Sequence, residues 1–254
     1  MLVTEEIAQA IKHGQMFLHY LPTVSLTDLH CEGAEALVRW RRRRAVLPAG
    51  AFIPLIENTP VSGMMTYWVI DSVAEELGVW LDEHPAAHIS INVPPEILGR
   101  GGLAYAAMRS GLQSRMSQVM LEITERGVPD RLGFEALRGL AERGVRLALD
   151  DTALSGTNLA LLSRCEFSVV KLDRQLTWQL EPEHAKPTWF RGLEALLKNS
   201  TVQVIAEGVE TEYQAEQLKS IGVQMAQGYF FSPPLSARQL MQFYVDKAGP
   251  QLAS

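Results

Sequence analysis

Polar side chains able to bind cations interrupt a series of short apolar runs in this sequence. They are carboxylates, two amides and one ammonium: Glu35, Asn92, Glu122, the adjacent Asp150 and Asp151, Lys171, Glu207 and Gln227. One polar residue at the end of an apolar run commonly caps a turn, but a set this large needs a shared chemical reason. Carboxylates buried together repel one another and lose their hydration, so such a group is costly unless cations neutralise it.

The residue types indicate which cation would do so. Carboxylate and amide oxygens are hard ligands, and no clustered Cys or His accompanies them, which favours Mg²⁺ or Mn²⁺ over Zn²⁺. Adjacent Asp150 and Asp151 can serve two ions, and two ions about 4 Å apart suit in-line attack on a phosphodiester. Lys171 can orient or deprotonate the attacking water, or neutralise charge at the phosphorus. This chemistry predicts metal-dependent hydrolysis of a phosphate ester and leaves the substrate open.

Regular alternation of strands and helices would position these groups. Runs rich in Val, Ile, Leu and aromatic residues begin at positions 16, 33, 88, 118, 146, 168, 201 and 226, and amphipathic stretches separate most of them. About eight such units are typical of the α/β class and of a TIM-like (β/α)₈ barrel, whose chemistry lies at the C-terminal ends of the strands. The expected helices are Met64–Glu83, Phe134–Arg143, Thr188–Lys198 and Thr211–Ile221, the second and fourth ending before Gly144 and Gly222.

The link between the first two strands, PTVSLTDLHCE from Pro22, is too short for a crossover helix. A parallel pair needs a connection of a dozen or more residues, so the first strand should run antiparallel to the rest. An open doubly wound sheet is the alternative. Neither a G-x-G-x-x-G segment after the first strand nor a P-loop supports it.

Composition predicts one soluble domain over residues 1–254, with a core at about 15–240. The hydrophobic fraction of 47% and the charged fraction of 20% are those of a globular chain, which excludes disordered and fibrous classes. A net charge of −6 gives no general attraction to DNA or to an anionic membrane. No signal peptide or membrane-length apolar run is present, so a cytoplasmic location is expected. Cys31 and Cys165 are too few for a disulfide framework.

The motifs resemble those of EAL domains, the bacterial cyclic di-GMP phosphodiesterases. EALVRW at Glu35–Trp40 is similar to the family signature, and the other family blocks follow in order: SINVPPEIL, LEITE, LALDD, VVKLDR, VIAEGVET and QGYFFSPPL. The three letters EAL alone occur by chance in many helices, whereas the ordered set is specific. The resemblance runs from about Gln15 to Leu240.

The resemblance implies a barrel with an antiparallel first strand and hydrolysis of cyclic di-GMP to linear pGpG with two Mg²⁺ or Mn²⁺ ions. It makes Lys171 the general base and Arg39 the contact to a substrate phosphate, with Gln227 completing the substrate site. Glu125 would hold the loop after the paired aspartates, and Glu210 would contact the site residues without itself binding metal or substrate. The implied metal ligands are Glu35, Asn92, Glu122, Asp150, Asp151 and Glu207, with Asp150 bridging both ions and Glu35 and Glu207 also counted as catalytic.

Two departures from the family pattern leave a second function open. The family reads DDFGTGYSS where this chain has DDTALSGTN from Asp150 to Asn158, so the loop from Asp151 to Asn158 lacks the glycines at the positions where the family uses them. The family's Y-Q-P reads Tyr20-Leu21-Pro22 here, and Leu21 cannot make the glutamine's hydrogen bond to a guanine. Pro94 in place of a family serine is a minor change. The alternative is an EAL domain of little or no activity that senses cyclic di-GMP or regulates a protein partner.

The family also implies a homodimer and a role in signalling processes such as biofilm formation. The run Arg41–Arg44 can attract an anionic dinucleotide, although most charge runs are solvated loops. The six histidines show no ligand spacing, which disfavours the HD class of cyclic di-GMP hydrolases.

Overall fold

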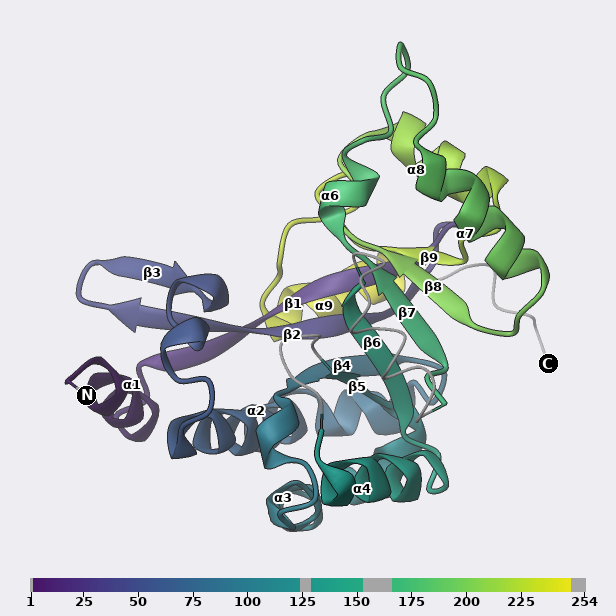
Figure 1. The fold of residues 1–254 in the computed structure, drawn as a ribbon. Helices are drawn as coiled ribbons and strands as arrows, with labels where there is room; N and C mark the ends of the chain where they lie inside the picture. Colours follow the sequence, from purple (N-terminus) through teal and green to yellow (C-terminus); the bar gives the residue numbers. More distant parts are fainter. Residues whose placement is uncertain (1, 124–128, 153–165, 248–254) are drawn as a thin grey trace.

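Eight strands form a closed barrel in the computed structural model, which describes residues 2–123, 129–152 and 166–247 (Figure 1). Around the ring the order is β1-β9-β8-β7-β6-β5-β4-β2, closed by the pairing of β1 with β2, while β3 extends β2 outside the ring. The TIM-like barrel is therefore confirmed. The strands are β1 (Met16–Ser25), β2 (Cys31–Arg42), β3 (Ala45–Pro48), β4 (His88–Val93), β5 (Val119–Ile123), β6 (Arg146–Thr152), β7 (Val169–Leu172), β8 (Gln203–Ala206) and β9 (Met225–Ala226).

Helices cover the outside of this barrel, with α2, α3 and α4 on one side and α7 and α8 on the other (Figure 1). The α-helices are α1 (Leu2–Lys12), α2 (Pro60–Glu83), α3 (Gly102–Ser110), α4 (Arg131–Ala141), α6 (Arg174–Thr177), α7 (Thr188–Lys198), α8 (Glu212–Ser220) and α9 (Ala237–Asp246). Short 3₁₀ turns join them: η1 (Ala49–Ala51), η2 (Ile53–Leu55), η3 (Pro95–Ile97) and η4 (Leu112–Gln118).

The first strand is antiparallel to both of its neighbours, β2 and β9, and the other neighbours around the ring are parallel. The antiparallel pairing of β1 with β2 follows from the short link between them, as predicted. The parallel strands read as continuous apolar runs because both of their faces are covered. Every residue of β5 and β7 is buried accordingly.

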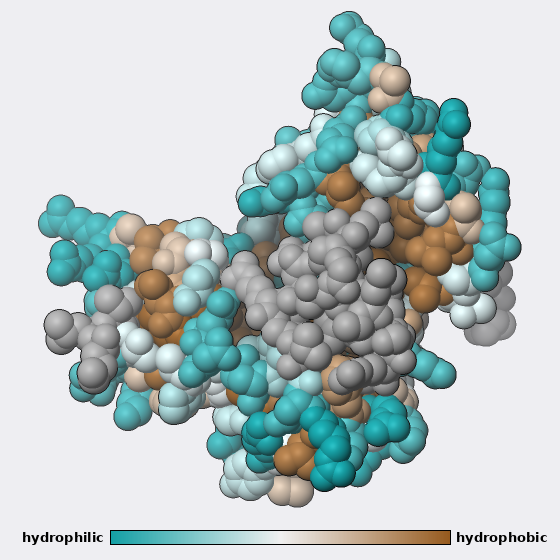
Figure 2. Space-filling view, in the orientation of Figure 1, coloured by the Kyte–Doolittle hydropathy of each residue, from teal (hydrophilic) through white to brown (hydrophobic). Residues whose placement is uncertain are grey.

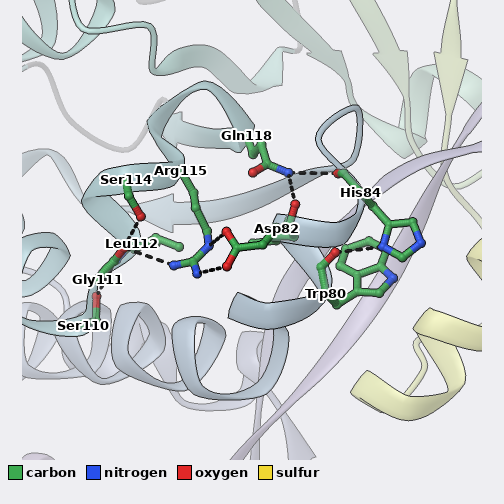
Figure 3. Close-up of polar contacts among 10 residues, drawn as sticks. Trp80, Asp82, His84, Ser110, Gly111, Leu112, Ser114, Arg115 and Gln118 are labelled. Carbon is green, nitrogen blue, oxygen red and sulfur yellow. Dashed lines mark hydrogen bonds and ion pairs between the residues drawn. The ribbon is translucent and has the colours of Figure 1, made fainter.

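Helix α2 begins at Pro60, earlier than the Met64 predicted from its apolar spacing. The side chain of Thr59 accepts a hydrogen bond from the N–H of Val61, and Pro60 occupies the first helical turn, where a missing N–H costs nothing. At its other end, Asp82 forms an ion pair with Arg115 of η4, with Arg115 Nε 2.8 Å from Asp82 Oδ1 (Figure 3). Gln118 Nε2 donates to the carbonyl of His84 at 3.0 Å, so the segment leading into β5 is held against α2 (Figure 3).

The last strand is shorter than predicted, and several short elements were not predicted at all. The run from Ala226 to Phe231 was expected to be a strand, but β9 ends at Ala226. A Cβ at Gly228, where φ is +153°, would lie 2.2 Å from the carbonyl oxygen of Val209, so the chain turns closely against its neighbour there. The sequence pattern also did not reveal β3 or the helices α1, α3, α6 and α9. Helix α4 begins and ends earlier than the predicted Phe134–Arg143, because the Asp130 side chain accepts a hydrogen bond from the N–H of Gly133 and caps its start. Gly144 and Gly222 have positive φ and follow α4 and α8, as expected for helix stops.

The β2–β3 hairpin projects from the barrel beside α1 (Figure 1). Its tip carries the exposed arginines of the 41–44 run and is hydrophilic, whereas hydrophobic residues reach the surface behind it (Figure 2). Val46 and Leu55 are about half exposed in this part of the chain. Among the described residues, no helix is both long enough and apolar enough to cross a membrane.

Candidate active site

An apolar layer fills the barrel interior below the site, with one side chain from each of five consecutive ring strands: Met120, Ala148, Val169, Ile205 and Met225. Side chains alternate along a strand, so the residue two positions later points to the same side. The chain places a polar residue at every one of these positions, on the strand or directly after it: Glu122, Asp150, Lys171, Glu207 and Gln227. The polar layer thus follows from the period of the strands and is supported from below by packed side chains.

Lys171 lies at the centre of this layer and is 1% exposed. Its Nζ contacts four carboxylates, three of them on β2, β5 and β6 and the fourth directly after β8. The distances are 3.0 Å to Glu35 Oε2, 2.8 Å to Glu122 Oε2, 3.2 Å to Asp150 Oδ1 and 2.7 Å to Glu207 Oε1. The strands therefore bring together at one point residues that are up to 172 positions apart in the sequence.

Two amide side chains hold the carboxylates in place. Gln227 Nε2 donates to Glu35 Oε2 at 2.9 Å and to Glu207 Oε1 at 3.1 Å. Asn92 Nδ2 donates to Glu35 Oε1 at 2.8 Å. Both oxygens of Glu35 are thereby engaged, and the oxygens of Gln227 and Asn92 remain as additional hard ligands.

The pKa values in the cluster reflect burial opposed by charge. Burial alone would lower the pKa of Lys171, but the four carboxylates outweigh it and raise that pKa well above its usual value. Burial and then the Glu35 carboxylate raise the pKa of Glu122 well above its usual value. Burial raises the pKa of Glu207 to about 8. For Glu35, burial is opposed by Lys171 and by the two amides, which together lower its pKa.

Glycines directly after two of these residues let the backbone turn at the rim. Gly208 follows Glu207 with φ +63°, and a Cβ there would lie 2.4 Å from the Cβ of Arg174. Gly228 follows Gln227 and meets the Val209 backbone as described above. These positions accept only glycine without displacing a neighbour, so the pairs Glu-Gly and Gln-Gly fix where the two functional side chains point.

The donor set fits a divalent cation of the Mg²⁺ class. Among the described residues, no three Asp, Glu, His or Cys side chains form a ready-made metal site, since Lys171 Nζ holds the point on which the carboxylates converge. However, Glu122 Oε1 is buried without a hydrogen-bond partner, and a carboxylate oxygen in that situation is stabilised by a cation. Glu35, Asn92, Glu122, Asp150 and Glu207 supply only oxygen ligands, as hard cations require.

The remaining predicted site residues lie outside this cluster or cannot be placed. Arg39 is half-buried on β2, four residues beyond Glu35, and its Nη1 donates to the carbonyl of Val38 at 3.0 Å. Glu210 is exposed before α8, and no described contact brings its side chain into the cluster. Asp151 belongs to β6, but its side chain lies outside the described part of the structure, as do Glu125 and residues 153–158.

A cavity of about 460 Å³ adjoins the cluster and was not predicted from the sequence. Glu35, Asn92 and Asp150 line one end of it. Ser62, Glu96 and Arg100 line it further along, and no spacing rule singles them out. For Glu96 the available signal was its place in the SINVPPEIL block, on η3 after β4, and Arg100 follows that block closely. No sequence signal marked Ser62 on α2.

The comparisons with known proteins agree with this geometry. The family model for the EAL domain matches residues 4–234. The probable cyclic di-GMP phosphodiesterase PdeB of Escherichia coli is 31% identical over 241 residues, which are 93% of this chain and 46% of PdeB. The cyclic di-GMP phosphodiesterase NbdA of Pseudomonas aeruginosa is 30% identical over 261 residues, 98% of this chain and 33% of NbdA. The chain thus spans a third to under half of these relatives.

Solved structures agree as well. The MucR phosphodiesterase of Pseudomonas aeruginosa, in complex with c-di-GMP, superposes with a TM-score of 0.82 at 28% identity, covering 94% of this chain and all of that one. The cAMP-bound EAL enzyme Bd1971 has a TM-score of 0.83 at 23% identity over 95% of this chain and 69% of its own, which shows the shared fold. With a family model matched over nearly its whole length, and with the motif residues gathered around Lys171, the chain belongs to the EAL domain family.

Proposed function

We propose that this chain hydrolyses cyclic di-GMP to linear pGpG with two bound Mg²⁺ or Mn²⁺ ions. The observation that carries the proposal is the group of four carboxylates around Lys171 at one end of a 460 Å³ cavity. The relatives PdeB and NbdA bear the name of this activity, and the MucR structure contains the nucleotide.

The residues divide the work of hydrolysis among them. When bound, the ions supply a reactive water and stabilise charge on the phosphoryl oxygens. Glu35, Asn92, Glu122, Asp150, Asp151 and Glu207 would hold the ions, and Arg39 would bind a phosphate. Water attacks the phosphorus in line and gives up one proton, the bond from phosphorus to the 3′ oxygen breaks, and that oxygen takes up one proton. One ring phosphodiester thus becomes a 5′-phosphate and a 3′-hydroxyl with the net addition of one water.

Lys171 acts on the attacking water, either by orienting it and neutralising charge at the phosphorus or as the general base that the family resemblance implies. Its Nζ lies within 3.2 Å of four of the carboxylates that would hold the ions, so it stands where that water would be bound. Gln227 positions Glu35 and Glu207 through its two donated hydrogen bonds.

The test is incubation of the protein with cyclic di-GMP and Mn²⁺ or Mg²⁺, with nucleotides separated by chromatography over time. Wild type should produce pGpG, and Glu35→Ala should produce none, because it removes a carboxylate that touches Lys171, Asn92 and Gln227. Glu83→Ala, at the exposed end of α2, is the matched control and should retain the rate. Equal rates for wild type and Glu35→Ala would refute the assignment.

A second function is favoured by one structural observation. Leu21 is paired with Glu35 in the β1–β2 register, so an apolar side chain stands beside the cluster where the family has glutamine. Under this alternative the chain binds cyclic di-GMP, or a protein partner, without turnover. Calorimetry that detects binding of cyclic di-GMP, together with no pGpG in the activity assay, would support it. After prolonged incubation the nucleotide would then still be intact and bound.

We also propose that the chain forms a homodimer and works in the cytoplasm, in signalling that controls biofilm formation. Sedimentation of the purified chain tests the first of these statements. A single species of monomer mass at concentrations well above those of the activity assay would refute it.

A further inference from the structure

The cavity beside the carboxylate cluster has a polar far end. Glu35, Asn92 and Asp150 line its near end, and Asn58, Ser62 and Glu96 line it where α2 begins. Its volume of about 460 Å³ lies in the range of small-molecule sites. A nucleotide whose phosphate is held at the cluster can therefore extend a nucleoside into this space.

The rest of the cavity lining is mostly apolar. It includes Ile53, Pro54, Met65, Val69 and Pro94. Aliphatic and proline side chains make favourable contact with the flat faces of a purine, but they do not distinguish one purine from another. Discrimination must come from the polar groups that meet the edge of the ring.

Glu96 is the polar group of the lining whose orientation is fixed by hydrogen bonds while one of its oxygens remains available. Its Oε1 accepts hydrogen bonds from the backbone N–H of Asn58 at 2.9 Å and from Ser62 Oγ at 2.9 Å. A carboxylate has about four acceptor sites, so these two bonds fix its orientation and leave the Oε2 side available. In the described parts of the chain no Lys, Arg or His forms an ion pair with Glu96, whereas nearby Arg100 is paired with Asp130 at 2.5 Å.

The chemistry of the purine edges determines what Glu96 can bind. Guanine presents two adjacent donors, N1–H and the N2 amino group, which match an acceptor-only carboxylate. Adenine presents an acceptor at N1 next to its N6 amino group, and two acceptors facing each other are unfavourable. We propose that Glu96 recognises the N1–H and N2 amino edge of one guanine of the substrate and sets the preference for guanine over adenine.

This inference rests on the proposed function and adds to it the residue that selects the base. It is tested with Glu96→Gln, which preserves the size of the side chain. The amide has one oxygen and one NH₂ group. If its oxygen continues to accept from Asn58 and Ser62, the NH₂ group faces the guanine donors; if it is turned around, the NH₂ group faces the N–H of Asn58. Either orientation loses one set of contacts.

The KM for cyclic di-GMP should rise about tenfold to hundredfold in Glu96→Gln, as expected for loss of hydrogen bonds to a charged group. The change in kcat should be much smaller, because Glu96 does not touch the carboxylate cluster. The ratio of kcat/KM for cyclic di-GMP over cyclic di-AMP should fall by a similar factor. Glu83→Gln, exposed at the other end of α2, is the matched control and should behave as wild type.

Calorimetric titration with both cyclic dinucleotides in a chelating buffer gives the same comparison without turnover, because the proposed hydrolysis requires the ions. Circular dichroism shows whether Glu96→Gln folds. If wild type hydrolyses cyclic di-GMP and folded Glu96→Gln retains its KM and its base preference, the inference is wrong while the proposed function stands. If wild type neither hydrolyses nor binds cyclic di-GMP, the proposed function fails and the inference fails with it. A selective loss of cyclic di-GMP affinity in Glu96→Gln supports both.

Discussion

Lys171→Met removes the positive charge that holds the active-site carboxylates together. Methionine is of similar length and keeps the packing, so the change isolates the ammonium group. At about 3 Å and an effective dielectric constant of about 20, each contact of Lys171 with a carboxylate is worth about 5 kcal/mol before desolvation is counted. Desolvation cancels most of this sum, and removing one partner from a buried ion pair typically costs about 3–5 kcal/mol net.

We therefore expect Lys171→Met to lower the free energy of unfolding by about 3–5 kcal/mol in a chelating buffer at neutral pH. Part of the loss should appear as proton uptake by the carboxylates, because protonation is the other way to relieve their repulsion. Urea denaturation followed by circular dichroism measures the free energy. Addition of Mg²⁺ or Mn²⁺ should restore more stability to the variant than to wild type, because a cation binds the exposed oxygens and stabilises the folded state by mass action.

A matched control separates burial from pairing. Lys198 forms an ion pair with Glu194 at 2.8 Å, the same distance as that between Lys171 and Glu122, but the Lys198 side chain is 68% exposed and that of Glu194 is 36% exposed. Lys198→Met should have no measurable effect, because solvent screens exposed pairs. If Lys171→Met unfolds in chelator within 1 kcal/mol of wild type, a change no larger than an ordinary surface substitution makes, the argument that Lys171 compensates the cluster is refuted.

Two further predictions concern groups outside the cluster. Burial, with a smaller contribution from Arg146, lowers the pKa of His88 to about 3, so between pH 6.5 and 3 the unfolded chain binds a proton that the folded chain does not. The free energy of unfolding should therefore fall with decreasing pH in this window, by up to about 1.4 kcal/mol per pH unit. Denaturation at several pH values should show that this free energy depends less steeply on pH in His88→Gln than in wild type. An equal dependence on pH in both proteins would contradict the prediction. Gly208→Ala should lower both stability and turnover, because its Cβ would strike Arg174 and move Glu207, whereas Gly192→Ala, with open space in α7, should not; equal effects in a melting assay would disprove the steric argument.

The local pattern of residues was sufficient to predict the barrel architecture and most of the residues of the polar layer. A link from Pro22 too short for a crossover helix required β1 to be antiparallel, and this depends only on chain length. The apolar runs also placed Glu122, Asp150 and Lys171 at the C-terminal ends of successive strands, and the structure has them there. These inferences succeed because they use short-range geometry that the tertiary structure cannot override.

The residue pattern did not predict the ends of elements that are set by caps or by contacts with distant segments. The expected last strand stopped at Ala226, because Gly228 turns against Val209 from another part of the chain. Helix α2 started earlier than its apolar spacing indicated, because capping by Thr59 and the rigid Pro60 decide where it begins. Short elements such as β3 and α3 contain too few residues to show a period of their own.

The sequence by itself determined that this chain carries the ordered EAL motifs and that its acidic residues end successive barrel strands. Only the tertiary structure decided that Lys171 contacts four carboxylates at once and that Gln227 bridges Glu35 and Glu207. It alone revealed the cavity that joins this cluster to Glu96. The physical reason is that motif order and strand period are properties of neighbouring residues, whereas distances between side chains and the shape of a cavity arise only when the barrel closes and brings separate strands together.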